Sequence, residues 1–175
     1  MAQTTSKNKI KTKQLSNTSL SADDFVRKSG ETLTGRLDMP YQPAFHAIQP
    51  NSPAVGDPII FSTALFNVGN CYNVSNGKFT APVAGTYFFV CHFLDLNTNT
   101  GDDRINIKVN GNVYGGLRFI MTKPSARWWT FYGYGTIPLA INDWVQVCSE
   151  ACSSAGGLIV YTDGAYTSFQ GFFIG

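Results

Sequence analysis

Charged side chains are scarce in this chain. Asp, Glu, Lys and Arg make up 14% of its 175 residues, whereas about a quarter is usual for a soluble domain. No run of 18 apolar residues occurs, so the sequence predicts no membrane span. The first 25 residues contain no apolar stretch of the kind found in secretion signals. A surface with so little charge indicates that another chain covers part of it.

Catalytic motifs are missing as well. The chain has two histidines, His46 and His92, and neither has a carboxylate or a nucleophile close to it in sequence. Both are interpreted as structural residues, and no enzymatic activity is expected. Four cysteines, at 71, 91, 148 and 152, are not spaced like zinc ligands. We expect buried free thiols, with a Cys148–Cys152 or a Cys71–Cys91 disulfide as the alternative.

One loop offers hard oxygen ligands. The segment "DLNTNTGDD" at 95–103 carries Asp95, Asp102 and Asp103, and carboxylate oxygens are ligands that Ca²⁺ prefers. The spacing is not that of an EF-hand, and acids in solvated loops are commoner than calcium sites. Calcium is therefore kept only as a weak candidate, and no other cofactor or metal is expected.

Positive charge collects near the start of the chain. Lys7, Lys9, Lys11 and Lys13 all precede the first acidic residue, Asp23. We interpret residues 1–22 as a basic arm that is either solvated or bound to an acidic partner surface. Nucleic acid is not an expected partner, because four lysines without arginine or an aromatic residue make a thin electrostatic footprint.

The rest of the chain is typical of short strands separated by turn residues. In "RINIKVNG", Ile105, Ile107 and Val109 alternate with polar residues, and Asn110-Gly111 follows as a strong hairpin signal. No apolar period of 3.6 residues is found, so the prediction is an all-β, ten-stranded jelly-roll sandwich. Its candidate strands are 43–48, 58–66, 70–74, 77–81, 86–96, 104–110, 113–121, 126–139, 143–150 and 166–174.

Aromatic residues occur in adjacent pairs, such as Phe88-Phe89, Trp128-Trp129 and Phe172-Phe173. Since neighbouring residues of a strand point to opposite faces, one member of each pair lies inside the sandwich and the other lies outside. An outer face of this kind would form a larger apolar patch than soluble monomers tolerate. The pattern therefore predicts that the protein associates with copies of itself.

Several spaced motifs resemble the C1q/TNF-like globular domain over residues 43–175. They are "GKFTAPVAGTY" at 77–87, "LAINDWVQV" at 139–147 and "TSFQGFFIG" at 167–175. In the second motif, Asn142 stands where the family usually has glycine. The resemblance implies a jelly-roll head that assembles as a homotrimer. It assigns core or trimer packing to Phe45, Phe79, Gly85, Tyr87, Phe169, Phe173 and Ile174.

The segment "FVRKSGETLTGRLDMP" at 25–40 resembles a motif that is common in bacteriophage tail-fibre proteins. This resemblance implies that residues 23–42 are a trimeric neck between the arm and the head, and that the protein is located in a virion. Under this interpretation the basic arm attaches the chain to other virion proteins through Lys7, Lys9, Lys11 and Lys13.

The function expected from this arrangement is adhesion to a host-surface receptor, with a glycan as the expected receptor class. Loops near 95–103, 122–126 and 152–166 should lie at the end of the head opposite the termini, where contacts with a receptor form. A capsid-decoration or tail-connector protein is the alternative, and a secreted C1q/TNF-like ligand is a further one. The candidate receptor-binding residues are Asn97, Asn99, Lys123, Trp128, Tyr132, Tyr161 and Asp163.

Overall fold

The computed structural model describes residues 42–51, 58–96, 100–125, 127–150, 160–163 and 166–175. The predicted arm and nearly all of the predicted neck lie outside these ranges, as do Asn97, Asn99 and Cys152. Residue contacts divide the chain into two units after Asp38, and all of the described residues belong to the second unit, residues 39–175. None of the described segments forms a helix with the length and apolar content needed to cross a membrane.

Ten strands make up the described part of this unit, and each falls on or beside a strand expected from the sequence. The strands are β1 (Ala44–Pro50), β2 (Phe61–Val68), β3 (Tyr72–Asn73), β4 (Lys78–Thr80), β5 (Gly85–Asp95), β6 (Gly101–Val109), β7 (Asn112–Lys123), β8 (Trp129–Leu139), β9 (Trp144–Glu150) and β10 (Ser168–Phe173).

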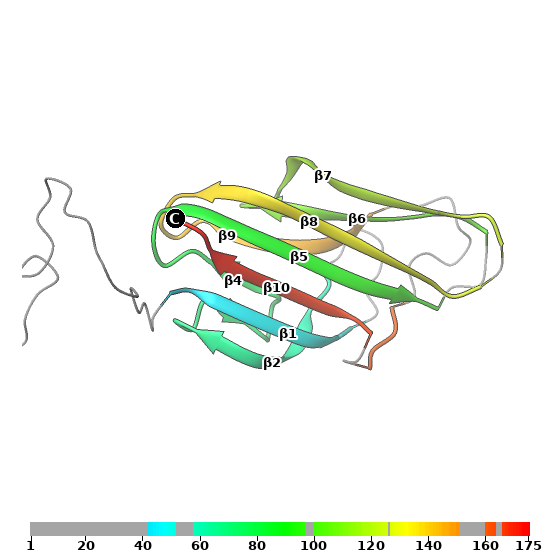
Figure 1. Ribbon diagram of the computed structural model, residues 1–175, viewed down its shortest axis with the longest axis horizontal. Coiled ribbons are helices and arrows are strands. Elements are labelled where there is room, and N and C mark those ends of the chain that lie inside the picture. Colours follow the sequence, from blue (N-terminus) through cyan, green and yellow to red (C-terminus); the bar gives the residue numbers. More distant parts are fainter. Residues whose placement is uncertain (1–41, 52–57, 97–99, 126, 151–159, 164–165) are drawn as a thin grey trace, which may run out of the picture. The chain divides into compact units, whose positions relative to one another are not determined.

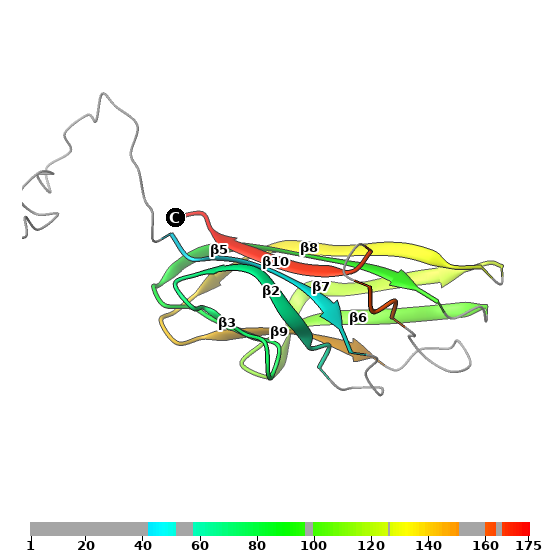
Figure 2. The same ribbon diagram turned by 90° about the horizontal axis from the view of Figure 1, so that it is seen from below.

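The strands form two antiparallel sheets of five. The first sheet has the order β2-β1-β10-β5-β8, and the second has the order β3-β4-β9-β6-β7. The two sheets lie face to face (Figure 2), and the start of β1 and the end of β10 meet at one end of the sandwich (Figure 1). This arrangement confirms the predicted all-β jelly-roll sandwich.

The hairpin predicted at Asn110-Gly111 joins β6 to β7. Both residues have positive φ angles, 51° and 85° respectively, as the tight turns that match the twist of a hairpin require. Glycine adopts this conformation without steric cost, and asparagine tolerates it better than most residues. The local sequence therefore determines where the chain reverses.

Aromatic rings fill the space between the sheets. The Phe45 ring stacks on Tyr72, with centroids 4.6 Å apart and an interplanar angle of 3°, and meets Phe169 edge-on at 5.0 Å. Phe79 and Tyr87 are also buried in this core, while Phe173 is half-buried and packs edge-on against Tyr87 at 5.2 Å.

Ile174 differs from the other residues assigned to packing. It lies just beyond β10, and 52% of its surface is exposed, so it is not part of the core of a single chain. The apolar pattern of the last strand continues into this residue, and its backbone N–H donates to the Thr86 carbonyl of β5, although β10 itself ends at Phe173. Whether Ile174 packs in a trimer stays a prediction.

Gly85, at the start of β5, has no room for a side chain. Its φ angle is 152°, and an added Cβ would meet the Phe173 ring and the carbonyl oxygen of Gly175. We expect Gly85→Ala to lower the free energy of unfolding by about 1–3 kcal/mol, because the ring or the backbone must shift. Urea unfolding measures the change. Gly115→Ala is the matched control, since nothing lies within 4 Å of its added Cβ, and an equal loss in both variants would contradict the prediction.

Candidate functional site

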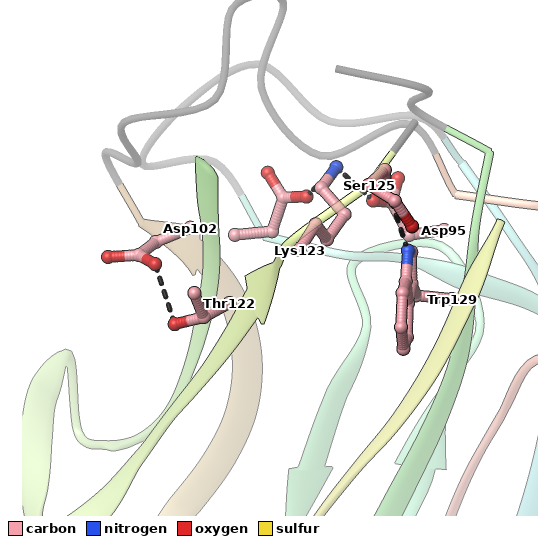
Figure 3. A network of polar contacts seen from close by, with 7 residues as sticks. Asp95, Asp102, Thr122, Lys123, Ser125 and Trp129 are labelled. Atoms are coloured by element: carbon pink, nitrogen blue, oxygen red, sulfur yellow. Dashed lines mark hydrogen bonds and ion pairs between the residues drawn. The ribbon is translucent and has the colours of Figure 1, made fainter. Parts of the chain in front are cut away.

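A buried ion-pair cluster lies at the end of the sandwich opposite the start of β1 and the end of β10 (Figure 1). Lys123 is the last residue of β7, Asp95 is the last residue of β5, and Asp103 lies near the start of β6. The Nζ atom of Lys123 lies 2.6 Å from Oδ2 of Asp95 (Figure 3) and also pairs with Oδ2 of Asp103. All three side chains are completely buried. We call these three residues the tip cluster.

Two opposing effects act on the ammonium group of Lys123. Burial alone would lower its pKa, because it penalises the charged form. Hydrogen bonds and charge attraction from Asp103 and Asp95 act in the other direction and prevail, so the pKa of Lys123 lies above its ordinary value. The group is therefore cationic in the folded protein and neutralises part of the charge of the two carboxylates.

This pairing bears on the calcium candidate, which stays a prediction. The ammonium of Lys123 occupies the position between Asp95 and Asp103 that a bound cation would need. Asp102 is directed elsewhere, because its Oδ1 accepts a hydrogen bond of 2.7 Å from the Thr122 hydroxyl (Figure 3). Within the ranges that the structure describes, no group of three or more His, Cys, Asp or Glu side chains is placed to hold a metal ion.

The burial of Lys123 also contradicts its prediction as a receptor contact. A side chain with none of its surface exposed cannot touch a receptor from this conformation. The strand pattern contained the signal that would have indicated this. Leu117, Met121 and Lys123 are separated by four and by two residues along β7, and all three are buried. Because side chains two or four residues apart in a strand lie on the same face, the lysine occupies an inward position.

Other residues predicted for recognition do lie on the surface near the tip cluster. Asp95 pairs with Trp129 in β8 on one side and with Val160 on the other, which brings 128–129 and 160–161 to the same end of the molecule. The Tyr161 ring meets the Tyr166 ring edge-on at 5.4 Å. We define the tip surface as the solvent-accessible residues of this region, Trp128, Tyr161, Asp163 and Tyr166.

The outer face of the first sheet is a second candidate site. Three rows of side chains cross its five strands on the side turned away from the second sheet. None of these positions holds Asp, Glu, Lys or Arg, although Tyr132 and Tyr134 are 61% and 63% exposed. We call this set the outer face: Val68, Ala44, Phe172, Phe88 and Thr136 in one row; Phe66, His46, Gln170, Val90 and Tyr134 in the next; and Thr63, Ile48, Ser168, His92 and Tyr132 in the third.

Tyr132 therefore belongs to the outer face rather than to the tip surface. It projects from β8 beside His92, with the two rings stacked 5.1 Å apart at an interplanar angle of 16°. The alternation of aromatic residues along β8 was apparent in the sequence. The registers of four strand pairs were needed to show that Tyr132 continues an uncharged surface that extends to β2.

The described cysteines are buried in the sandwich. Cys71 and Cys91 carry free thiols, which excludes the alternative Cys71–Cys91 disulfide. Desolvation raises the pKa of Cys71 to about 11 and that of Cys91 to about 12. Since the thiolate is the reactive form, we expect iodoacetamide at pH 8 to leave both unmodified in the folded protein and to modify both in 6 M guanidinium. Peptide mass mapping measures this, and rapid native labelling of Cys91 would be contrary to the prediction.

Comparisons with known proteins agree with this geometry. A model of the C1q domain matches residues 44–174. Complement C1q and tumor necrosis factor-related protein 9 of Mus musculus is 39% identical over 59 residues, which are 34% of this chain and 17% of that protein. The match thus spans only about a sixth of the length of this relative.

Solved structures share the fold at low sequence identity. The globular domain of zebrafish complement 1qA protein aligns with a TM-score of 0.62 and 21% identity, over 77% of this chain and 98% of that chain. Murine APRIL at pH 5.0 aligns with a TM-score of 0.58 and 13% identity, over 76% of this chain and 99% of that chain. Because the family model extends across the whole sandwich, this chain belongs to the C1q domain family.

Proposed function

We propose that the chain is a non-enzymatic adhesion protein of a bacteriophage virion, in which three copies associate through their outer faces and present their tip surfaces to a host-surface receptor. The observation that carries this proposal is the outer face, a five-stranded surface that combines exposed aromatic rings with a complete lack of charged side chains at its defined positions.

The outer face favours a second copy of the chain as its partner. Isolated apolar residues are normal on a surface, but exposed aromatic and aliphatic side chains gathered on one uncharged face indicate an interface. An uncharged face is matched best by another uncharged face, since a charged partner group would lose its hydration without gaining a counterion. The identical face of a neighbouring copy meets this requirement, and the C1q family resemblance implies three copies.

The tip surface suits recognition of a carbohydrate. The exposed rings of Trp128 and Tyr166 offer apolar platforms for sugar rings, and Asp163 lies exposed beside them with a carboxylate that can accept hydrogen bonds from hydroxyl groups. A trimer presents three copies of such a site. Three weak contacts held together bind far more tightly than one, because each later contact forms within the same complex.

The assignment to a virion is supported by the resemblance of residues 25–40 to the phage tail-fibre motif. Under this proposal the neck joins the head to an arm whose lysines attach to other virion proteins. Immunogold electron microscopy of phage particles, with an antibody against residues 43–175, tests the assignment and separates a tail location from a capsid location. Absence of the protein from purified particles would overturn it.

A second candidate is a secreted C1q/TNF-like ligand. The observation in its favour is that the mouse relative and the zebrafish and murine structures are C1q or APRIL proteins. Both candidates use a trimeric binding head, so trimer formation does not distinguish them. The immunogold experiment does, because a secreted ligand is recovered from the culture medium and is absent from particles.

A binding assay tests the adhesion role itself. Fluorescently labelled full-length protein is incubated with bacterial cells that the parent phage infects and with cells that resist adsorption. The proposal expects saturable binding to the susceptible cells alone, and it expects Trp128→Ala and Tyr166→Ala to weaken that binding. Equal binding to both cell types would contradict a receptor-specific function.

A further inference from the structure

Both histidines of the chain lie within the outer face. His46 projects from β1 and His92 projects from β5, in two adjacent rows of that face. They are the only histidines in the 175 residues. Histidine is the side chain whose ordinary pKa places its change of charge between pH 5 and 8. The charge of the outer face near neutral pH is therefore set by these two residues.

Among the residues that the structure describes, the strand neighbours of His46 include no other group that titrates in this range. Its neighbours across the strands are Phe66 on β2, whose ring lies 6.0 Å away edge-on, and Gln170 on β10. Its neighbours on the same face of β1 are Ala44 and Ile48. None of these side chains carries a charge that could balance an imidazolium.

The surroundings of His92 are similar. Tyr132 stacks on it from β8, Ser168 lies opposite on β10, and Val90 and Leu94 flank it along β5. None of these neighbouring side chains is a carboxylate that could balance an imidazolium. A proton taken up by His92 would thus create a positive charge without a partner in the face.

From this placement we propose that association through the outer face requires His46 and His92 to be neutral, so that mild acid separates the copies. The inference rests on the proposed homotrimer and identifies what regulates it. Its physical basis is the cost of covering an imidazolium on a face whose defined positions hold no carboxylate. Charges removed from water without a counterion carry a large free-energy penalty.

The direction of the pH dependence follows from proton linkage. Burial already lowers the pKa of His46 and of His92 in a single chain, and covering the face with a second chain removes more water from both rings. Separate copies therefore bind more protons than the assembled form. Association is at full strength above the ordinary histidine pKa of about 6.5 and weakens as the pH falls below it.

The test is sedimentation of the full-length chain at constant ionic strength and at pH 7.5, 6.5, 5.5 and 5.0. For the wild type, we expect the protomer concentration at half-assembly to rise by at least about tenfold between pH 7.5 and 5.5. Circular dichroism at each pH verifies that the sandwich stays folded. The rise is expected to reverse when the sample is returned to pH 7.5.

The matched variant is His46→Phe/His92→Phe, which retains an aromatic ring at both positions but cannot take up a proton. We expect its half-assembly concentration to change by less than about twofold over the same range. His46→Gln/His92→Gln provides a second, more polar pair in case the phenylalanine variant does not fold. A pH dependence in a folded double variant equal to that of the wild type would overturn the histidine mechanism.

Two other outcomes are decisive and distinguishable. A wild-type trimer whose half-assembly concentration stays constant from pH 7.5 to 5.0 overturns the inference and leaves the proposed trimer intact. A wild-type chain that is monomeric at pH 7.5 over the whole concentration range overturns the proposed trimer, and the inference with it.

Discussion

Replacement of Lys123 by methionine is expected to lower the free energy of unfolding by about 3–5 kcal/mol. Methionine has nearly the length of the lysine side chain, so the packing changes little, but the cation disappears. The carboxylates of Asp95 and Asp103 would remain buried without the ammonium that neutralises them. Removal of one partner of a buried ion pair costs far more than the net value of the intact pair, because the remaining charge is both desolvated and uncompensated.

Guanidinium unfolding at a fixed protomer concentration measures this loss, since the stability of an assembling protein depends on concentration. Lys108→Met is the matched control. It removes the same charge from β6, at a half-exposed position, and we expect a change within about 0.5 kcal/mol. If Lys123→Met and Lys108→Met unfolded at the same midpoint concentration of guanidinium, the tip cluster would contribute little to stability.

Removal of the carboxylates should restore the lost stability. In the triple variant Asp95→Asn/Asp103→Asn/Lys123→Met, no charge remains in the tip cluster. Neutral replacement of a buried ion pair is often close to neutral for stability, so we expect most of the loss to be recovered. If the triple variant were as unstable as Lys123→Met, the loss of stability would come from packing around residue 123 rather than from electrostatics.

The sandwich was predictable because its determinants are local. Alternation along "RINIKVNG" indicates which residues of β6 point inward, and Asn110-Gly111 places the hairpin that follows it. The Gly77–Tyr87 motif then fixes the end of β4 and the start of β5. Each signal acts within about ten residues, so the order and approximate position of the strands could be inferred without knowledge of which strands pair.

The tip cluster was not predictable in the same way, because its members come from three strands. Asp95, Asp103 and Lys123 meet only when β5, β6 and β7 take their places in two different sheets. The sequence indicated that their loops share one end of the head, and on that basis Lys123 was predicted to be exposed. Lys123 lies six residues after Leu117 and two after Met121, so it shares their inward face of β7, which indicated burial. Lys123 is buried because the two aspartates compensate its charge.

The outer face was predictable in part. Paired aromatic residues indicated that one member of each pair lies outside the core, and β8 shows this pattern clearly. The location of the histidines in the same face depends on the pairing of β1 with β10 and of β10 with β5. A β-bulge in the pairing of β1 with β2 also shifts the register between His46 and Ala47, and no local signal in the sequence specified it.

Replacement of Tyr134 by glutamate is expected to prevent association of the protein. Tyr134 lies on β8, in the row of the outer face that contains His46, and 63% of its surface is exposed in a single chain. A glutamate at this position is hydrated in the separate chain, so the variant should fold. In the assembled form its carboxylate would be buried in a face without cations. A cost of about 3–5 kcal/mol for this burial raises the half-assembly concentration at least about a hundredfold.

Light scattering coupled to size exclusion measures the result at pH 7.5. Three copies of the 19.1 kDa chain have a mass of about 57 kDa, which is the mass expected for the wild type. The Tyr134→Glu variant should show the mass of one copy. Ile120→Glu is the matched control, because Ile120 is 55% exposed on β7 of the second sheet and lies away from the outer face. This control adds the same charge to a surface of similar exposure. If the Tyr134→Glu variant dissociates into single chains and the Ile120→Glu variant stays assembled, the interface lies on the first sheet. If instead only the Ile120→Glu variant dissociates, the interface lies on the second sheet, which would contradict the role assigned to the outer face.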